Sequence, residues 1–357
     1  MPEFLSNEEI VLAARKRLGQ GQWDYLVGGS ESETSLRRNR LAFDRIAFRP
    51  RVMVDVSHID ASTTFLGHRL RIPAMLAPVG SLHTFTPEGA AAAAKAAAEF
   101  GILQVVSSVT GLSGEDVMAA SEAPKIFQLY IRGDWDWAKE QLDRIKKAGY
   151  SALTITADTA VSSRRERPLL TRYAGQGAGR PADPKWAAST TWETIARMKD
   201  YVGLPLLLKG VGTAEDADLA VQHGVDVVWV SNHGGRQLDH SLGSMDVLPE
   251  VVKAVNGRAR VIVDGGVQRG SDILKAVAMG ADAVALGKLQ AWGLAADGKA
   301  GVIRMLELLE HELTSAMGLL GVTSMKQLGP QYLAEGQVVT PPHEMSSWTN
   351  MPGTRIQ

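Results

Sequence analysis

Residues 225–239, VDVVWVSNHGGRQLD, join an apolar run to a polar turn that contains two glycines. Residues 225–230 have the composition of a buried β-strand, because a parallel sheet covered by helices on both faces needs apolar side chains on both sides. The turn carries His233 and Arg236 three residues apart. The stretch therefore predicts a parallel strand that presents polar side chains at its carboxyl end.

Seven further apolar runs of this kind occur along the chain. The eight runs are 72–77, 102–107, 125–130, 152–157, 205–209, 225–230, 260–264 and 282–287. Helical patterns follow them, beginning near Pro87, Ser113, Trp135, Thr191, Thr213, Met245, Gly270 and Ala291. Eight strand–helix units predict an α/β fold whose parallel sheet closes into a (β/α)8 barrel, the TIM barrel. A doubly wound open sheet is the alternative.

The rest of the chain predicts one domain, residues 1–357, with three parts. Residues 1–70 form an N-terminal helical flank, 71–320 the barrel and 321–357 a tail of coil. Ser6 and Asn7 precede an amphipathic run from Glu8 to Leu18, which is typical of a capped helix.

A long loop follows the fourth strand. More than 30 residues rich in Arg, Gly, Pro and Ser separate that strand from the helix near Thr191. Ordinary loops of this kind are far shorter, so the segment predicts a functional or mobile lid. An inserted linker without function is the alternative.

Composition excludes several classes of function. Lys and Arg number 38 against 39 Asp and Glu, so no global field attracts nucleic acid or an anionic membrane. The chain has no cysteine, which excludes disulfides, thiolate metal sites and cysteine nucleophiles, and we expect no metal site. The N-terminus lacks the apolar core of a signal peptide, and the alanine-rich stretch 90–98 is too short to span a bilayer. We therefore expect a cytoplasmic protein.

Polar residues follow several of the predicted strands. Because active sites of such barrels lie at the carboxyl ends of the strands, these side chains are expected to converge on one rim. They are Gln128, Tyr130, Thr156, Asp158, Arg165, Lys209, Ser231, His233 and Arg236.

The polar turn after the sixth strand contains a possible base and a possible carboxylate-binding group. His233 can take a proton near neutral pH, and the guanidinium of Arg236 matches a planar carboxylate. After the last two strands, DGGV (264–267) and Gly287-Lys288 offer free backbone N–H groups where barrels commonly hold phosphate. With Lys209 opposite, they indicate a cofactor that carries a phosphate.

With these motifs in order, the chain resembles the family of FMN-dependent 2-hydroxy acid oxidases and dehydrogenases, which includes glycolate oxidase, lactate oxidase and mandelate dehydrogenase. The resemblance covers nearly the whole chain. Its motifs are WDYLVGGS, LAPVG, FQLY, TADT, SRRE, LLLKG, SNHGGRQLD, DGGV and LGK.

The resemblance implies a role for each matching residue. His233 would be the base, Asp158 would stabilise the imidazolium, and Tyr130 would contact the reacting hydroxyl. Arg165, Arg236 and Tyr25 would hold the substrate carboxylate. Lys209 would lie beside the flavin N1 and O2 edge. FMN would be bound by Ala77, Val79, Ser107, Gln128, Thr156, Lys209, Ser231, Asp264, Gly266, Gly287 and Lys288.

The sequence departs from the family in the binding site. Gln268 and Lys288 stand where the family usually has arginine, which puts the phosphate contacts in doubt. Val109 replaces a tryptophan that lines the pocket of glycolate oxidase, and Gly80 stands where alanine is common. Both changes predict a pocket open to bulkier acids, and these two residues are included among the substrate-binding ones.

The expected reaction is the oxidation of an (S)-2-hydroxy acid to the 2-oxo acid, with oxygen as acceptor and hydrogen peroxide as product. A dehydrogenase that passes electrons to a quinone or another carrier is the alternative, and a redox-neutral FMN barrel isomerase or a barrel without activity are remote ones. The family precedent implies a homotetramer.

Overall fold

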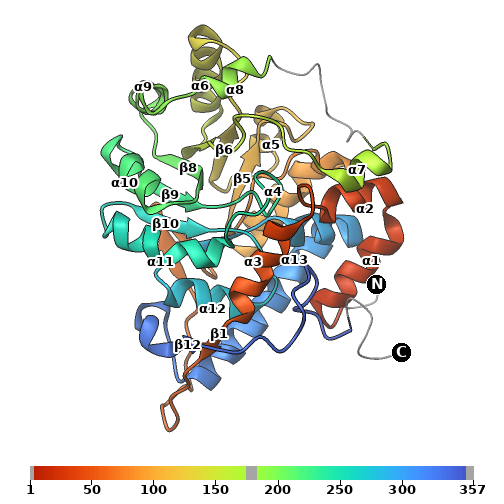
Figure 1. The fold of residues 1–357 in the computed structure, drawn as a ribbon, viewed down its shortest axis with the longest axis vertical. Helices are drawn as coiled ribbons and strands as arrows, with labels where there is room; N and C mark the ends of the chain where they lie inside the picture. The colour runs from red at the N-terminus through yellow and green to blue at the C-terminus, as the bar shows by residue number, and fades with distance from the viewer. Residues whose placement is uncertain (1–3, 174–182, 351–357) are drawn as a thin grey trace.

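The computed structural model describes residues 4–173 and 183–350, and its centre is a closed barrel of eight parallel strands (Figure 1). Neighbouring strands pair in chain order, and β11 closes the barrel on β4 through the pairs Val284–Ala74 and Leu286–Leu76. The predicted barrel is thus confirmed and the open sheet is wrong. The strands are β4 (Ala74–Leu76), β5 (Leu103–Ser107), β6 (Lys125–Leu129), β7 (Ala152–Thr156), β8 (Leu206–Val211), β9 (Val227–Val230), β10 (Arg260–Val263) and β11 (Ala283–Leu286).

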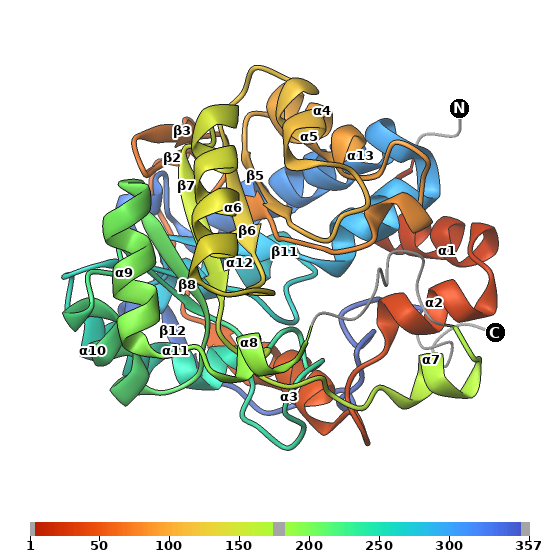
Figure 2. The same ribbon diagram turned by 90° about the horizontal axis from the view of Figure 1, so that it is seen from above.

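Helices cover the outside of the barrel, as Figure 2 shows for α6, α9, α10 and α11. They are α4 (Gly89–Phe100), α5 (Gly114–Ala119), α6 (Trp135–Ala148), α9 (Trp192–Val202), α10 (Ala214–Gln222), α11 (Ser244–Val255), α12 (Gly270–Ala278) and α13 (Lys288–Leu320). Ser113, Asp134 and Thr213 accept a backbone N–H in the first turns of α5, α6 and α10, which explains why these helices begin close to their predicted starts.

The N-terminal flank begins with three helices, α1 (Asn7–Arg17), α2 (Gln20–Val27) and α3 (Thr34–Asp44). Ser6 caps α1, and the helix starts at Asn7, one residue before the predicted start. β1 (Ile46–Phe48) then pairs with β12 (Leu333–Glu335), so the tail contributes a short strand that the sequence did not predict. Short 3₁₀ turns are η1 (Leu82–Thr84), η2 (Met325–Gln327) and η3 (Pro330–Tyr332).

A β-hairpin closes the amino-terminal end of the barrel. β2 (Thr63–Phe65) and β3 (His68–Leu70) pair antiparallel just before the first barrel strand. Phe65 and Leu70 are each 1% exposed and pack with side chains of the barrel interior, including Met75 and Trp229. The predicted helical flank therefore also contains a hairpin, whose apolar residues extend the interior core.

The loop after β7 contains two short helices, α7 (Glu166–Leu170) and α8 (Lys185–Ala188). α7 contacts α2, so the first part of the loop lies against the flank. The predicted lid also includes residues 174–182, which lie outside the described part of the chain.

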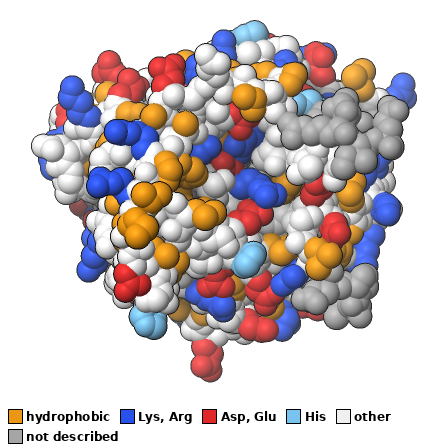
Figure 3. Space-filling model, turned by 90° about the horizontal axis from the view of Figure 1, so that it is seen from below, with side chains coloured by type: hydrophobic (Ala, Val, Ile, Leu, Met, Phe, Trp, Pro, Cys, Tyr) orange, Lys and Arg blue, Asp and Glu red, His pale blue; other side chains and the backbone are white. Residues whose placement is uncertain are grey.

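Acidic and basic side chains alternate over the surface in Figure 3, without a large field of one sign on that face. No helix in 4–173 or 183–350 is long and apolar enough to cross a membrane.

Candidate active site

A cavity lies at the carboxyl ends of the barrel strands, where most of the predicted site residues meet. Five of the predicted residues do not line it: Ser107, Gln128, Thr156 and Ser231, which are buried, and Asp158, which contacts His233. The predicted residues that line the cavity are Tyr25, Ala77, Val79, Gly80, Val109, Tyr130, Arg165, Lys209, His233, Arg236, Asp264, Gly266, Gly287 and Lys288.

His233 stands at the start of a sharp turn and faces this cavity. Its φ is +58°, and Gly234 and Gly235 continue the left-handed turn with φ of +65° and +76°. A residue with a Cβ is strained in this region, and such strain is characteristic of functional sites. The backbone N–H of His233 donates to Ser231 Oγ at 3.0 Å, which helps to hold the turn.

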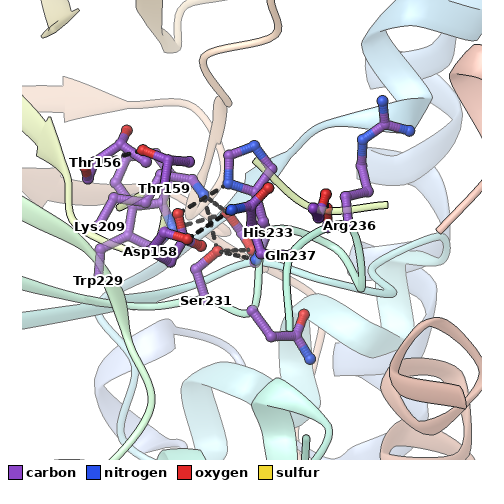
Figure 4. Close-up of polar contacts among 12 residues, drawn as sticks. Thr156, Asp158, Thr159, Lys209, Trp229, Ser231, His233, Arg236 and Gln237 are labelled. Carbon is purple, nitrogen blue, oxygen red and sulfur yellow. Dashed lines mark hydrogen bonds and ion pairs between the residues drawn. The ribbon is translucent and has the colours of Figure 1, made fainter. Parts of the chain in front are cut away.

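Asp158 fixes the orientation of the His233 ring. Its Oδ1 lies 3.0 Å from His233 Nδ1, so Nδ1 carries the proton when the ring is neutral and Nε2 remains for a ligand in the cavity (Figure 4). Burial and the charge of Lys209 lower the pKa of His233, against the opposing effect of Asp158. The imidazole is therefore neutral at physiological pH and can accept a proton.

Lys209 belongs to a buried, hydrogen-bonded array close to His233 and Asp158 (Figure 4). Its Nζ donates to Ser231 Oγ at 2.9 Å and lies 3.5 Å from Asp264 Oδ2. Trp229 Nε1 also donates to Asp264, at 3.1 Å. Burial tends to lower the pKa of Lys209, but the negative charges of Asp264 and Asp158 outweigh it and raise the pKa. The cavity thus has a fixed ammonium group beside the histidine.

Two guanidinium groups line the cavity without a carboxylate partner among the described residues. Arg165 donates to Ser163 Oγ, Gln237 Oε1 and the carbonyl of Arg236. The side chain of Arg236 points away from His233 and Asp158 in Figure 4. It donates to the carbonyls of Tyr25 and Gly28 at 2.7 and 2.9 Å. Burial and then the charge of Arg165 lower the pKa of Arg236 to about 10. Two half-buried cations that repel each other are suited to bind an anion.

Two buried polar groups near the cavity have no hydrogen-bond partner in the described residues, which allows the fit of a flavin to be tested. The amide Nε2 of Gln128 and the hydroxyl of Thr156 are buried and have no hydrogen-bond partner. Ser107 Oγ donates to Gln128 Oε1 at 2.8 Å, so the amide oxygen of Gln128 is engaged and its N–H₂ group is available to a ligand. The pyrimidine edge of a flavin presents both acceptors and a donor, so these residues fit it.

The far end of the cavity carries the residues predicted for the phosphate. Gly265 and Gly266 have φ of +93° and +87°, and a Cβ on Gly266 would lie 2.8 Å from the carbonyl oxygen of Asn39. Lys288 Nζ donates to the carbonyl of Val27 at 2.7 Å. Gln268 also lines the cavity, but its amide is bound to the carbonyl of Glu344 at 2.6 Å. The phosphate end thus fits an anion through glycine backbone and one lysine.

Part of the cavity lining is apolar. It is formed by Val79, Gly80, Phe85 and Val109. A Cβ on Gly80 would lie 2.9 Å from Val109 Cγ2, so the two small residues expected to open the pocket are in contact with each other.

Several residues that line the cavity were not predicted from the sequence, among them Arg40, Phe85 and Glu344. Arg40 of α3 donates to the carbonyl of Gly266 at 2.7 Å and pairs with Asp272. Phe85 precedes α4, and Glu344 comes from the tail. Arg40 lies in a basic run that is typical of a solvated helix, and no local pattern marks the other two.

The barrel brings a histidine, a lysine and two arginines to one cavity, an arrangement suited to the oxidation of a substrate that carries a carboxylate. Residues 14–335 match the family described as FMN-dependent dehydrogenase. The chain belongs to this family, and its cofactor is FMN.

Known relatives cover almost the whole chain. It is 36% identical to glycolate oxidase of Spinacia oleracea, over 93% of this chain and 96% of the relative, and 38% identical to L-lactate oxidase of Nostoc sp., over 90% and 95%. A solved structure of mandelate oxidase matches with a TM-score of 0.87 at 35% identity, covering 94% of this chain and 99% of that one. An active chimera of (S)-mandelate dehydrogenase matches with the same TM-score at 34% identity, over 93% and 99%.

Proposed function

We propose that this protein oxidises an (S)-2-hydroxy acid to the corresponding 2-oxo acid. The observation that carries the proposal is that His233, held by Asp158 at 3.0 Å, lines the same cavity as Arg165 and Arg236. The named relatives are oxidases and dehydrogenases, which supports oxidation over a redox-neutral isomerisation or a barrel without activity.

In the proposed reaction, Arg165, Arg236 and Tyr25 bind the substrate carboxylate. Nε2 of His233 removes one proton from the substrate, and Asp158 stabilises the imidazolium that results. Tyr130, whose pKa is raised by burial, stays protonated and contacts the hydroxyl. FMN, when bound, would supply the two-electron acceptor for the oxidation at C2 and would take up the second hydrogen of the substrate.

We assign the binding of FMN to three groups of residues. Gln128, Thr156, Ser107 and Ala77 hold the pyrimidine part, and Lys209 offsets negative charge that develops there. Val79, Ser231 and Asp264 lie along the cavity between the two ends. Gly266, Gly287 and Lys288 hold the phosphate.

The substrate is proposed to be bulkier than glycolate, with an aromatic acid as the first choice. Val109 and Gly80 remove side-chain volume from the wall beside the base, and Phe85 adds an aromatic surface. A structure of a mutant mandelate oxidase with (S)-mandelic acid matches this chain with a TM-score of 0.88 at 36% identity, which supports the choice.

Oxygen is the proposed electron acceptor, with hydrogen peroxide as product. The oxidases among the relatives support this choice, and the mandelate dehydrogenase chimera keeps a carrier-dependent dehydrogenase as the alternative.

One experiment tests the reaction and the acceptor together. The purified holoenzyme is mixed without oxygen with glycolate, lactate, 2-hydroxyoctanoate or (S)-mandelate, and flavin bleaching is followed by visible absorbance. We expect the fastest bleaching with mandelate, and return of colour with peroxide on admission of air. A flavin that none of these acids bleaches contradicts the proposed reaction, and equal rates with glycolate and mandelate contradict the proposed pocket.

We further propose a cytoplasmic protein, folded as one domain over residues 1–357, that forms a homotetramer and has no nucleic-acid or membrane partner. Light scattering during gel filtration measures the tetramer directly, and fractionation of source cells measures the location. A monomeric holoenzyme, or activity that sediments with membranes, contradicts the respective proposal.

A further inference from the structure

The C-terminal segment 343–350 returns to the phosphate end of the cavity. In Figure 1 it runs from β12 back toward α3 and α1. Ser346 Oγ donates to Asp44 of α3 at 3.1 Å, and the backbone N–H of Asn350 donates to Glu8 of α1 at 2.9 Å. Trp348 is 1% exposed and packs against Arg269. The segment is therefore anchored at several points beside the cavity.

Gln268 ties this segment to the turn after β10. Its amide N–H₂ donates to the carbonyl of Glu344 at 2.6 Å, and Ser347 Oγ donates to its Oε1. Both polar ends of the Gln268 side chain are thus engaged by the segment. The residue at the family's arginine position serves as an anchor for the tail and contributes no charge to the phosphate end.

The anchored segment places a carboxylate in the cavity. Glu344 lines it together with Gln268 and Lys288 and is 6% exposed. Its Oε1 lies 2.8 Å from Arg167 Nη2, and the same nitrogen also bonds to Glu33. Burial tends to raise the pKa of Glu344, but its own backbone N–H and the positive charges of His343, Arg167 and Lys288 hold the pKa below its usual value. Glu344 is therefore ionised at neutral pH.

The charged side chains near the phosphate end of the cavity give it no net positive charge. Arg167 is shared by Glu33 and Glu344, so this group of three carries an excess negative charge. Lys288 faces it, but burial and the charge of Arg236 lower the pKa of Lys288 to about 7, with Glu344 opposing the shift. Arg40 also lines the cavity, but it is already paired with Asp44 and Asp272. A phosphate dianion placed here therefore meets no net positive charge from these side chains and must rely on backbone N–H groups.

We propose that Glu344 sets the flavin selectivity of this protein: its carboxylate faces the phosphate of bound FMN and weakens the hold on that group relative to the rest of the flavin. This rests on the assignment of the phosphate to Gly266, Gly287 and Lys288 given above. Riboflavin, which has the ring and the ribityl chain without the phosphate, should accordingly bind almost as well as FMN.

The test compares FMN and riboflavin on protein stripped of flavin, with affinities measured by quenching of flavin fluorescence. Glu344→Gln keeps the shape and removes the charge, and we expect FMN affinity to rise by about fivefold or more while riboflavin affinity stays constant. Glu344→Asp keeps the charge and should keep the ratio of the two affinities. Glu335→Gln removes an exposed carboxylate from β12 and should change neither.

Other results of the same measurements would overturn the proposal. Weaker FMN binding by E344Q, or equal changes for FMN and riboflavin, would mean that the carboxylate supports the flavin or only packs the tail, and would overturn the proposal. If E344Q does not fold by circular dichroism, the unmodified protein decides: a preference for FMN above about 10³-fold overturns the proposal, and one below about tenfold supports it. Unmodified protein that binds neither flavin overturns the cavity assignment itself.

Discussion

His233 Nδ1 lies 3.0 Å from Asp158 Oδ1, and this contact decides which nitrogen of the ring faces the substrate. An asparagine at 158 could present its amide N–H₂ to Nδ1 and reverse the tautomer. Asp158→Asn should therefore slow flavin reduction by about 10²- to 10⁴-fold and leave FMN content unchanged. Stopped-flow absorbance without oxygen measures the rate. Asp183→Asn, on the same loop but exposed, is the matched control, and a normal rate in D158N contradicts the assigned role.

The pH dependence should follow the neutral form of His233. Burial and Lys209 lower the pKa of His233, so activity should rise with pH and reach its plateau below the range expected of an ordinary histidine. Removal of the ammonium charge by Lys209→Met makes the imidazolium easier to form, which raises this pKa and moves the acidic limb to higher pH. The pH profile of kcat/KM gives the apparent pKa of the acidic limb, and this value does not depend on the maximal rate of each variant.

Lys299→Met is a control for that shift, because Lys299 is exposed and paired with Glu99. Its profile should coincide with that of the unmodified protein. An acidic limb in K209M that stays in place, or moves to lower pH, would show that Lys209 does not act on the base.

Loss of Arg165 should affect acids and spare esters. Arg165→Met removes a half-buried cation worth about 2 to 5 kcal/mol to a paired carboxylate, or roughly 30-fold to several-thousand-fold in kcat/KM. The methyl ester of the same hydroxy acid has no carboxylate charge for Arg165 to bind, so its rate of oxidation should change little in the variant. Arg164→Met alters the exposed neighbour and should affect neither substrate. A parallel loss for acid and ester would place Arg165 outside the carboxylate site.

Gly80 and Val109 should act as a pair. In Gly80→Ala the added methyl group would lie 2.9 Å from Val109 Cγ2, which pushes the valine into the cavity. We expect KM for mandelate to rise and KM for lactate to change little. The double variant G80A/V109A gives the methyl group room and should recover the mandelate KM. Additive effects in this double-mutant cycle would contradict the contact.

The two glycines after His233 should differ in stability. A Cβ on Gly235 would lie 2.5 Å from the backbone of Leu36, whereas a Cβ on Gly234 meets nothing within 4 Å. Gly234→Ala should cost only about 1 to 2 kcal/mol for its positive φ. Gly235→Ala should cost more and detach the turn from α3. Urea unfolding of the holoenzymes measures both, and equal losses would contradict the close approach at Gly235.

The barrel could be predicted because its signals are local. Each strand is a continuous apolar run, and capping residues such as Asp134 and Thr213 mark where helices begin. The hairpin at 63–70 and the β1–β12 pair could not be predicted, since strands of three residues have little pattern of their own and form where the barrel offers them a partner.

The same distinction holds for the site. Residues at strand ends, such as Lys209 and His233, converge because the topology brings strand ends together, and most of them do line one cavity. Glu344 and Arg167 are 177 positions apart, and no local pattern connects them. The direction of Arg236 toward the end of α2 likewise depends on how the flank docks, which a motif alone does not specify.

The hairpin that carries Phe65 and Leu70 also bears on the order of events in turnover. Because these side chains fill the amino-terminal end of the barrel, the cavity among residues 4–173 and 183–350 lies at the opposite end, where substrate, product and electron acceptor would share one entrance. A bulky acceptor must then wait until the 2-oxo acid has departed, whereas a diatomic gas has no such need. Initial-rate patterns with a carrier should consequently be of the ping-pong type, with each reactant competing against the other for the same entrance.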